Sequence, residues 1–365
     1  MSLARALSIA SPTRDTPRAP VTDGRWAAIW RNGHAMIRLA PRATSQPLFD
    51  MTLCLEFTVP PPRRGTALRL WQGAADPDRA ICLYAMPDGA LRLVHGEIDI
   101  STEAGFARSG ETVTLRYRSC ARGRADIADF SNADRPLRRR LRAGLPHLAR
   151  LDEALPRDPR FLSICHVAAI AEFGLLPTDL PALDGNAILQ TTRGPVAARN
   201  LKPGMHLLTV TGQPMPLRWI EARPRLCLGR NAPVLMRAPY FGLTHDICVT
   251  PETRVLRSGP AVEYIFDHEM VLMAASDMTA SPGAFRDRRE PVRYFFHLML
   301  DDHACVSVDR CGVETALLAD VVAATDHGPR PNLSEADRTP CLPVLDRAGA
   351  QALISASAKG RRSLI

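Results

Sequence analysis

The sequence has little lysine and few aromatic residues. Lys202 and Lys359 are its only lysines, so nearly all of the formal net charge of +8 comes from arginine. Aromatic residues make up 5% of the chain, which leaves few rings on which nucleic-acid bases could stack. The densest arginine cluster, "RPLRRRLR" at residues 135–142, is typical of a solvated helix or loop face, and a phosphate-binding patch is the alternative. Nucleic acid is therefore not an expected partner.

The sequence also lacks any paired C-x-x-C motif. Its nine cysteines are odd in number, and Cys54, Cys82, Cys165 and Cys248 lie inside short apolar runs. Buried reduced thiols explain this pattern more simply than a disulfide framework or a zinc site. We therefore expect no metal, no cofactor and a reducing compartment.

Long hydrophobic runs are missing as well. No apolar run approaches the length of a membrane span, and the first twenty residues lack the continuous apolar core of a signal peptide. These features predict a cytoplasmic protein without a membrane span, and export by a route without such a signal stays open.

The first half of the chain reads as short strands. Residues 1–22 are polar and interrupted by proline, which is typical of a loose arm. From residue 23 to 176, partly alternating runs are bounded by Pro, Gly or Asp, and "MPDGA" at residues 86–90 predicts a hairpin turn. This spacing predicts an antiparallel β-sandwich, and it loosely resembles concanavalin-like domains. Such a sandwich could bind carbohydrate through exposed rings, for which the candidates are Trp26, Trp30 and Trp71.

The strand pattern is interrupted once and then resumes. Residues 135–161 predict one or two helices with proline stops, and the apolar run at 161–177 fits either a last strand or a buried helix. Residues 177–320 return to short strands that end in Gly or Pro turns, and residues 321–365 form a proline-rich tail that is helical near its end. The predicted fold class is mostly all-β, in two domains with a short helical tail.

Three phrases of the second half, in order, resemble the Hint (hedgehog/intein) domain, in the branch found in bacteria. "GNAILQTTRGPVAARNLKPGMHLLTV" is similar to the opening of that family, "ICVTPETRVL" to its T-x-x-H block, and "VRYFFHLMLDDHACVSVDRCGVET" to its closing strand pair. The resemblance covers about residues 180–318. It implies a β domain in which a Cys or Ser at the first position attacks the preceding carbonyl, assisted by the Thr and His of the block.

This sequence departs from the family pattern at three separate positions. Pro181 occupies the position of the nucleophile, and proline has neither a nucleophilic side chain nor an N–H. Thr253 occupies the histidine position of the block, where a hydroxyl cannot act as an acid or base near neutral pH. Glu314 and Thr315 stand where splicing domains carry His and Asn. Three separate losses are hard to attribute to a shifted alignment.

The remaining candidate site residues are Thr250, Asp301 and His303. Thr250 keeps the threonine of the block. Strand alternation would place Asp301 and His303, which are two residues apart, on one face beside Thr250. We assign His297 to the other face. We interpret Asp301 and His303 as relics of the family site or a repurposed general base, or as a hydrogen-bonded polar pair that fills the old site. Cys248 and Cys305 could share these faces, and we expect both to be buried and unreactive.

These observations favour a Hint-domain protein that no longer cleaves itself and acts as a structural or interaction module. The first alternative is a self-cleaving domain with an unrecognised nucleophile, and the second is a carbohydrate-binding protein that uses the sandwich. A protein or a glycan is the expected kind of partner.

Overall fold

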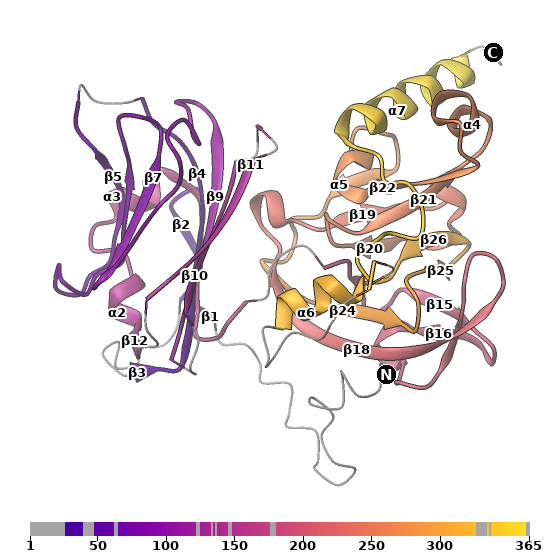
Figure 1. Cartoon of the computed structure of the whole chain (residues 1–365), viewed down its shortest axis with the longest axis horizontal. Helices are drawn as coiled ribbons and strands as arrows, with labels where there is room; N and C mark the ends of the chain where they lie inside the picture. The colour runs from indigo at the N-terminus through magenta and orange to yellow at the C-terminus, as the bar shows by residue number, and fades with distance from the viewer. Residues whose placement is uncertain are drawn as a thin grey trace, which may run out of the picture. The chain divides into compact units, whose positions relative to one another are not determined.

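The structure is a computed structural model of the 365-residue chain. It describes residues 26–38, 47–61, 65–121, 125–132, 134–135, 137–144, 148–175, 180–325, 334–335 and 337–362, so the predicted arm at 1–22 lies outside the described residues. The chain divides into two compact units, residues 20–175 and residues 176–365. Both are built mainly from strands, which confirms the predicted fold class (Figure 1).

The first unit is a sandwich of two antiparallel sheets. The larger sheet has seven strands in the order β11 (Leu137–Ala143), β10 (Asp126–Asn132), β9 (Thr112–Cys120), β4 (Asp50–Thr58), β13 (Cys165–Ala171), β1 (Trp26–Arg31) and β2 (His34–Arg38). The smaller sheet has the order β5 (Leu68–Gln72), β6 (Cys82–Ala85), β7 (Leu91–His95) and β8 (Ile98–Ser101). The pair β3 (Pro47–Leu48) and β12 (Ala149–Arg150) and the short helices α2 (Leu151–Ala154) and α3 (Arg160–Ser163) complete the unit.

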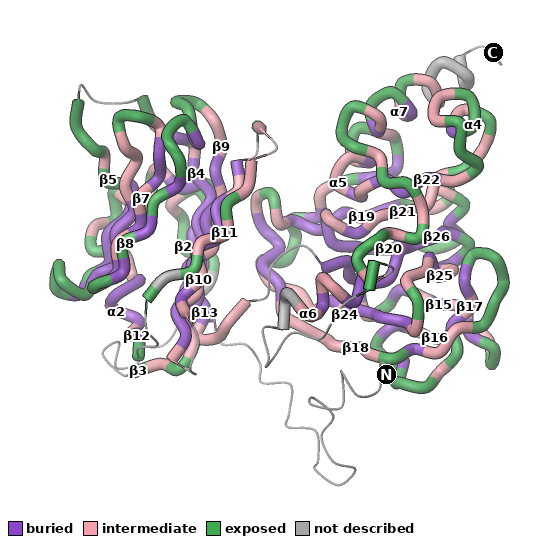
Figure 2. The backbone as a smooth tube through the Cα atoms, in the orientation of Figure 1, coloured by how far each residue is buried: buried purple, intermediate pink, exposed green. Residues whose placement is uncertain are grey.

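Alternate residues of the strands fill the space between the two sheets. In β4, Leu53, Leu55 and Phe57 are buried in one core with Leu83 of β6 and Leu91 of β7 (Figure 2). Burial of each such side chain stabilises the fold by about 1.5–3 kcal/mol relative to exposure. The run at 161–177 fitted either a strand or a helix. Its first residues belong to α3, and residues 165–171 form β13, which lies between β4 and β1 in the larger sheet.

The predicted hairpin turn at residues 86–90 is confirmed. It joins β6 to β7, and Gly89 adopts a φ of +84°, which glycine tolerates and most other residues avoid. The predicted carbohydrate platform is wrong, because Trp26, Trp30 and Trp71 are 6%, 7% and 0% exposed. These rings pack in the interior and present no face to a sugar.

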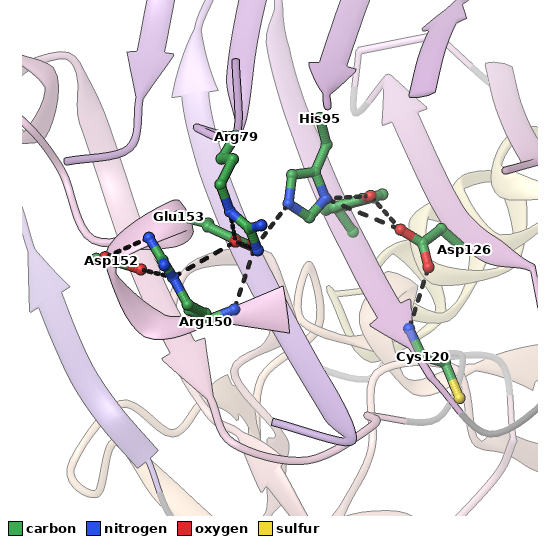
Figure 3. A network of polar contacts seen from close by, with 8 residues as sticks. Arg79, His95, Cys120, Asp126, Arg150, Asp152 and Glu153 are labelled. Atoms are coloured by element: carbon green, nitrogen blue, oxygen red, sulfur yellow. Dashed lines mark hydrogen bonds and ion pairs between the residues drawn. The ribbon is translucent and has the colours of Figure 1, made fainter. Parts of the chain in front are cut away.

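A polar network that the sequence did not indicate crosses the interior of the sandwich (Figure 3). The His95 ring from β7 lies 2.8 Å from the Tyr117 hydroxyl of β9 and 3.0 Å from the Glu153 carboxylate of α2. Tyr117 donates in turn to Asp126, and the exposed Arg79 donates to Glu153 at 2.9 Å. Burial alone would raise the pKa of Glu153, but bonds from His95 and Arg79 hold it below its usual range. The network therefore ties α2 and both sheets together.

The arginine cluster forms an edge strand, which corrects the predicted helix. In β11, Leu137 and Leu141 pack against the core, while Arg138 and Arg140 reach Asp129 on the neighbouring strand at 2.9 and 3.4 Å. Arg116 of β9 also donates to Asp129, at 2.7 Å. Burial opposes ionisation of Asp129, but the three guanidinium groups outweigh it and hold its pKa far below the usual range. These arginines are engaged within the sandwich.

The second unit is built around one curled antiparallel sheet of thirteen strands. Their order is β22 (Met270–Ala274), β21 (Arg254–Ser258), β26 (Cys311–Glu314), β25 (Cys305–Val308), β15 (Ile188–Thr191), β17 (His206–Leu208), β18 (Pro214–Leu226), β24 (Val292–Leu300), β14 (Leu183–Asp184), β20 (Ile247–Val249), β19 (Val234–Met236) and β23 (Ala284–Arg286), with β16 (Gly194–Ala197) paired to β15. The short helices are η1 (Ala198–Asn200), η2 (Gly229–Asn231), η3 (Tyr240–Gly242), α4 (Pro260–Phe266) and α5 (Ala275–Met278), and the tail adds α6 (Leu318–Thr325) and α7 (Arg347–Arg362).

The tail docks onto this sheet. Val344 forms a parallel bridge with Leu272 of β22, and the Leu272 N–H donates to the Pro343 carbonyl at 2.8 Å. Helix α7 then lies beside α4 and α5, and its Ala350 and Leu353 are buried in the core of the unit (Figure 1). The C-terminal segment is thus part of the folded second unit.

Candidate functional site

The segment that opens the second unit runs into the middle of the sheet. Pro181 and Ala182 precede β14, which pairs with β24 on one side and with β20 on the other. Asp184 at the end of β14 forms an ion pair with Arg293 of β24, which fixes the strand beside its neighbour. The backbone at residues 181–182 therefore lies where side chains from β24 and from the end of β20 can reach it.

Two threonines hold the backbone of Ala182. Its N–H donates to the Thr253 hydroxyl at 3.0 Å, and its carbonyl accepts from the Thr250 N–H at 3.0 Å and from the Thr253 hydroxyl at 3.1 Å. The two hydroxyls lie 2.8 Å apart, and both residues are fully buried. If the Thr250 hydroxyl donates to the Thr253 hydroxyl, then both hydroxyls and the N–H and carbonyl of Ala182 all have hydrogen-bond partners. Thr250 is thus in contact with the opening segment through its backbone, and Thr253 through its side chain.

The turn that carries the two threonines is anchored by charge. The Thr253 N–H donates to the Thr250 carbonyl at 3.1 Å, which closes a tight turn between β20 and β21. Glu252 inside this turn accepts two bonds from Arg225 of β18, at 2.8 and 2.6 Å. Both bonds come from Nη2 of Arg225, and such charge-assisted bonds hold the turn against β18.

His297, rather than His303, is the histidine that reaches this segment. Its Nδ1 lies 3.0 Å from the Pro181 carbonyl, and the residue is 5% exposed. Burial lowers the pKa of His297 to about 3, and Arg225 and Arg223 add to this effect, while the bond to Pro181 opposes it. The ring is therefore neutral near pH 7, and its Nδ1–H donates to the Pro181 carbonyl.

The prediction that Asp301 and His303 sit together beside Thr250 is wrong. Strand β24 ends at Leu300, so the alternation on which that prediction rested stops before Asp301. Asp301 instead accepts from Arg218, with one contact of 2.8 Å. His303 lies against Glu314 and Cys341.

The cysteines are mostly buried, as predicted. Cys248 and Cys305 are 5% and 2% exposed, whereas Cys341 is exposed. Burial raises the pKa of Cys248 to about 12 even though Arg293 lies nearby, so this thiol stays protonated near neutral pH. Within the described ranges, no group of three or more His, Cys, Asp or Glu side chains is arranged to hold a metal ion.

The geometry agrees with what comparisons with known proteins find. Residues 181–320 match the family model described as the Hint domain. Among solved structures, the chain matches a GSH-linked, splice-inactive variant of the AceL NrdHF class 3 split intein at 14% identity, with a TM-score of 0.24 over 37% of this chain and 97% of that chain. No curated protein matches. None of the described helices is long and apolar enough to cross a membrane.

The family match begins at Pro181 and extends through β14, the Thr250–Thr253 turn and the β25–β26 hairpin. These are the segments that the sequence resemblance relied on. The chain is therefore a Hint-domain-containing protein, with its Hint domain at residues 181–320.

Proposed function

We propose that this Hint domain does not cleave its own chain and serves as a structural or interaction module. The observation that carries the proposal is Pro181 at the first position of the matched domain. A self-attacking domain needs a thiol or hydroxyl there, next to the carbonyl that it attacks. Proline supplies neither group, and its ring restricts the backbone at that point.

The surrounding polar groups support the same conclusion. In the resemblance, cleavage takes place at the bond before the first residue, which here joins residues 180 and 181. The Thr253 hydroxyl bonds to Ala182, and His297 bonds to the Pro181 carbonyl, so both act on groups after that bond. Thr253 cannot take the place of an imidazole as an acid or base near neutral pH. The hydrogen bonds from Thr253 and His297 hold the backbone at residues 181–182 in place, so these two residues have a structural role.

The alternative is a self-cleaving domain with an unrecognised nucleophile. The two possibilities differ in the mass of the purified chain. The wild-type protein, incubated at neutral pH with and without dithiothreitol, should remain one species of 40.0 kDa in an intact-mass measurement. Pro181→Ala is the matched control, because it restores an N–H without adding a nucleophile. Two wild-type fragments with the masses of residues 1–180 and 181–365 would show that the chain cleaves itself with an unrecognised nucleophile.

A further inference from the structure

A second cluster of reactive groups lies where the tail crosses the β25–β26 hairpin. Cys341 belongs to the segment that docks beside β22, and its backbone N–H donates to Nδ1 of His303 at 3.0 Å. The side chain of Cys305, the first residue of β25, interacts with the side chain of Cys341. Glu314 of β26 is the register partner of Cys305. Two cysteines far apart in the sequence are thus side by side with a histidine and a glutamate.

The histidine and glutamate form a buried pair. His303 Nε2 lies 3.5 Å from Glu314 Oε2, with side chains that are 4% and 1% exposed. The other oxygen of Glu314 accepts from the Arg254 side chain at 2.9 Å, which orients the carboxylate. Burial would lower the pKa of His303, but Cys341 and Glu314 raise it to about 9. Nδ1 accepts the Cys341 backbone N–H, which holds the tail segment beside the histidine.

The two thiols differ in exposure and in the direction of their pKa shifts. Cys341 is exposed, whereas Cys305 is 2% exposed. Interactions with Cys305 and with the His303 ring lower the pKa of Cys341 to about 5, against the effect of burial. The interaction with Cys341 and burial raise the pKa of Cys305, with further contributions from Glu314 and Cys311. Near neutral pH, Cys341 is an accessible thiolate and Cys305 is a protonated thiol beside it.

We propose that Cys341 and Cys305 form a dithiol site that reacts with hydroperoxides, in which Cys341 attacks the oxidant and Cys305 closes a disulfide. An accessible thiolate beside a second thiol is the arrangement that oxidation-sensing cysteines share. The Cys341 sulfur attacks one peroxide oxygen, the O–O bond breaks, and the second oxygen leaves with a proton as water or an alcohol. The Cys305 sulfur then attacks the Cys341 sulfenic acid, and a disulfide forms as water leaves. The dithiol loses two electrons and the peroxide gains them.

The disulfide would tie the tail covalently to the Hint sheet. In the reduced structure, the segment around Cys341 is held by hydrogen bonds such as those of Leu272 to Pro343 and Leu345. A bond from Cys341 to β25 closes a loop that contains α6 and restricts the unfolded chain. The proposed thiol chemistry does not depend on whether the Hint domain cleaves itself.

The product of oxidation tests the proposal. The full chain, treated with a small excess of hydrogen peroxide at neutral pH, should lose the mass of two hydrogen atoms, and peptide mapping should find Cys305 joined to Cys341. Cys305→Ser should stop at the sulfenic acid, which dimedone traps on Cys341. Cys341→Ser should show neither product. Cys311→Ser is the matched control, because burial raises the pKa of that thiol to about 12, and it should behave as the wild type.

The pH dependence of alkylation is a second readout that needs no oxidation. Iodoacetamide should modify Cys341 of the wild type with a midpoint near pH 5, below the ordinary thiol value of 9.0. His303→Asn should raise this midpoint and slow the reaction at pH 7 about tenfold or more, because the thiolate fraction falls. A wild-type midpoint near the ordinary value, or oxidation of Cys341 that never reaches Cys305, would overturn the proposal.

Discussion

His297 gives the site a clear dependence on pH. Its pKa is about 3 in the folded protein, against an ordinary value of 6.5. Between these values the unfolded chain binds a proton that the folded chain does not, so stability falls as the pH falls through this window and is fully present above 6.5. The contribution lost at pH 5 is about 2 kcal/mol.

We therefore expect the wild type to lose stability between pH 7 and pH 4 more steeply than His297→Asn, which keeps an N–H donor for the Pro181 carbonyl but does not titrate. Denaturant unfolding at each pH measures this difference. Equal slopes for the two proteins would show that His297 is not held neutral by burial.

The two threonines should differ in importance although both are buried and three residues apart. Thr253→Val leaves the Ala182 N–H without an acceptor, which costs about 1–3 kcal/mol. Thr250→Val removes only a hydroxyl that contacts Thr253, whose bonds to Ala182 remain. Hydrogen exchange of the Ala182 amide should accelerate in Thr253→Val and change little in Thr250→Val. The opposite order would mean that Thr253 does not hold this backbone.

At the residue scale, the sequence predicted the opening segment at Pro181 and the Thr250–Thr253 turn, but it did not predict that His297 contacts that segment. Pro181 and the Thr250–Thr253 block were identified from the resemblance, and the structure brings them together. His297 was assigned to the face opposite Asp301 and His303, although even spacings of four and six residues place all three on one face of a regular strand. Of the three, only His297 lies within β24, which ends at Leu300. Cys341 carried no signal, since only the docking of the tail brings it to Cys305.

Strand β11 illustrates how ion pairs hold an edge of the sandwich. Asp129→Asn should lower the free energy of unfolding by about 2 kcal/mol, because Arg116, Arg138 and Arg140 lose the charge that they share. Asp99→Asn is the matched control, since it breaks an exposed pair with Arg92 and should have little effect. Thermal unfolding of both variants measures the difference, and equal effects would contradict a structural role for Asp129.

At the element scale, strands with clear turns were predictable and the arginine-rich segment was not. Leu137 and Leu141 are four residues apart, a spacing that suits one face of a helix and equally one face of a strand. The acceptor that settles the choice, Asp129, lies on the neighbouring strand, and its pairing with Arg138 and Arg140 is not visible in a single sequence. Local pattern therefore could not decide this element.

At the scale of the whole molecule, residues 181–320 form a Hint domain, and the proposed loss of self-cleavage rests on the changed nucleophile and histidine positions. The family model matches residues 181–320, and β14 pairs with both β20 and β24. The turn after β20 binds the backbone of Ala182. What is missing is a nucleophile at Pro181 and an imidazole at Thr253.

The most direct measurement is the intact mass of the double variant Pro181→Cys with Thr253→His, incubated with dithiothreitol beside the wild type and both single variants. We predict that only the double variant gives fragments from cleavage at the 180–181 bond and that the other three chains stay whole. A folded double variant that stays whole, or a wild-type chain that cleaves itself there, would contradict it.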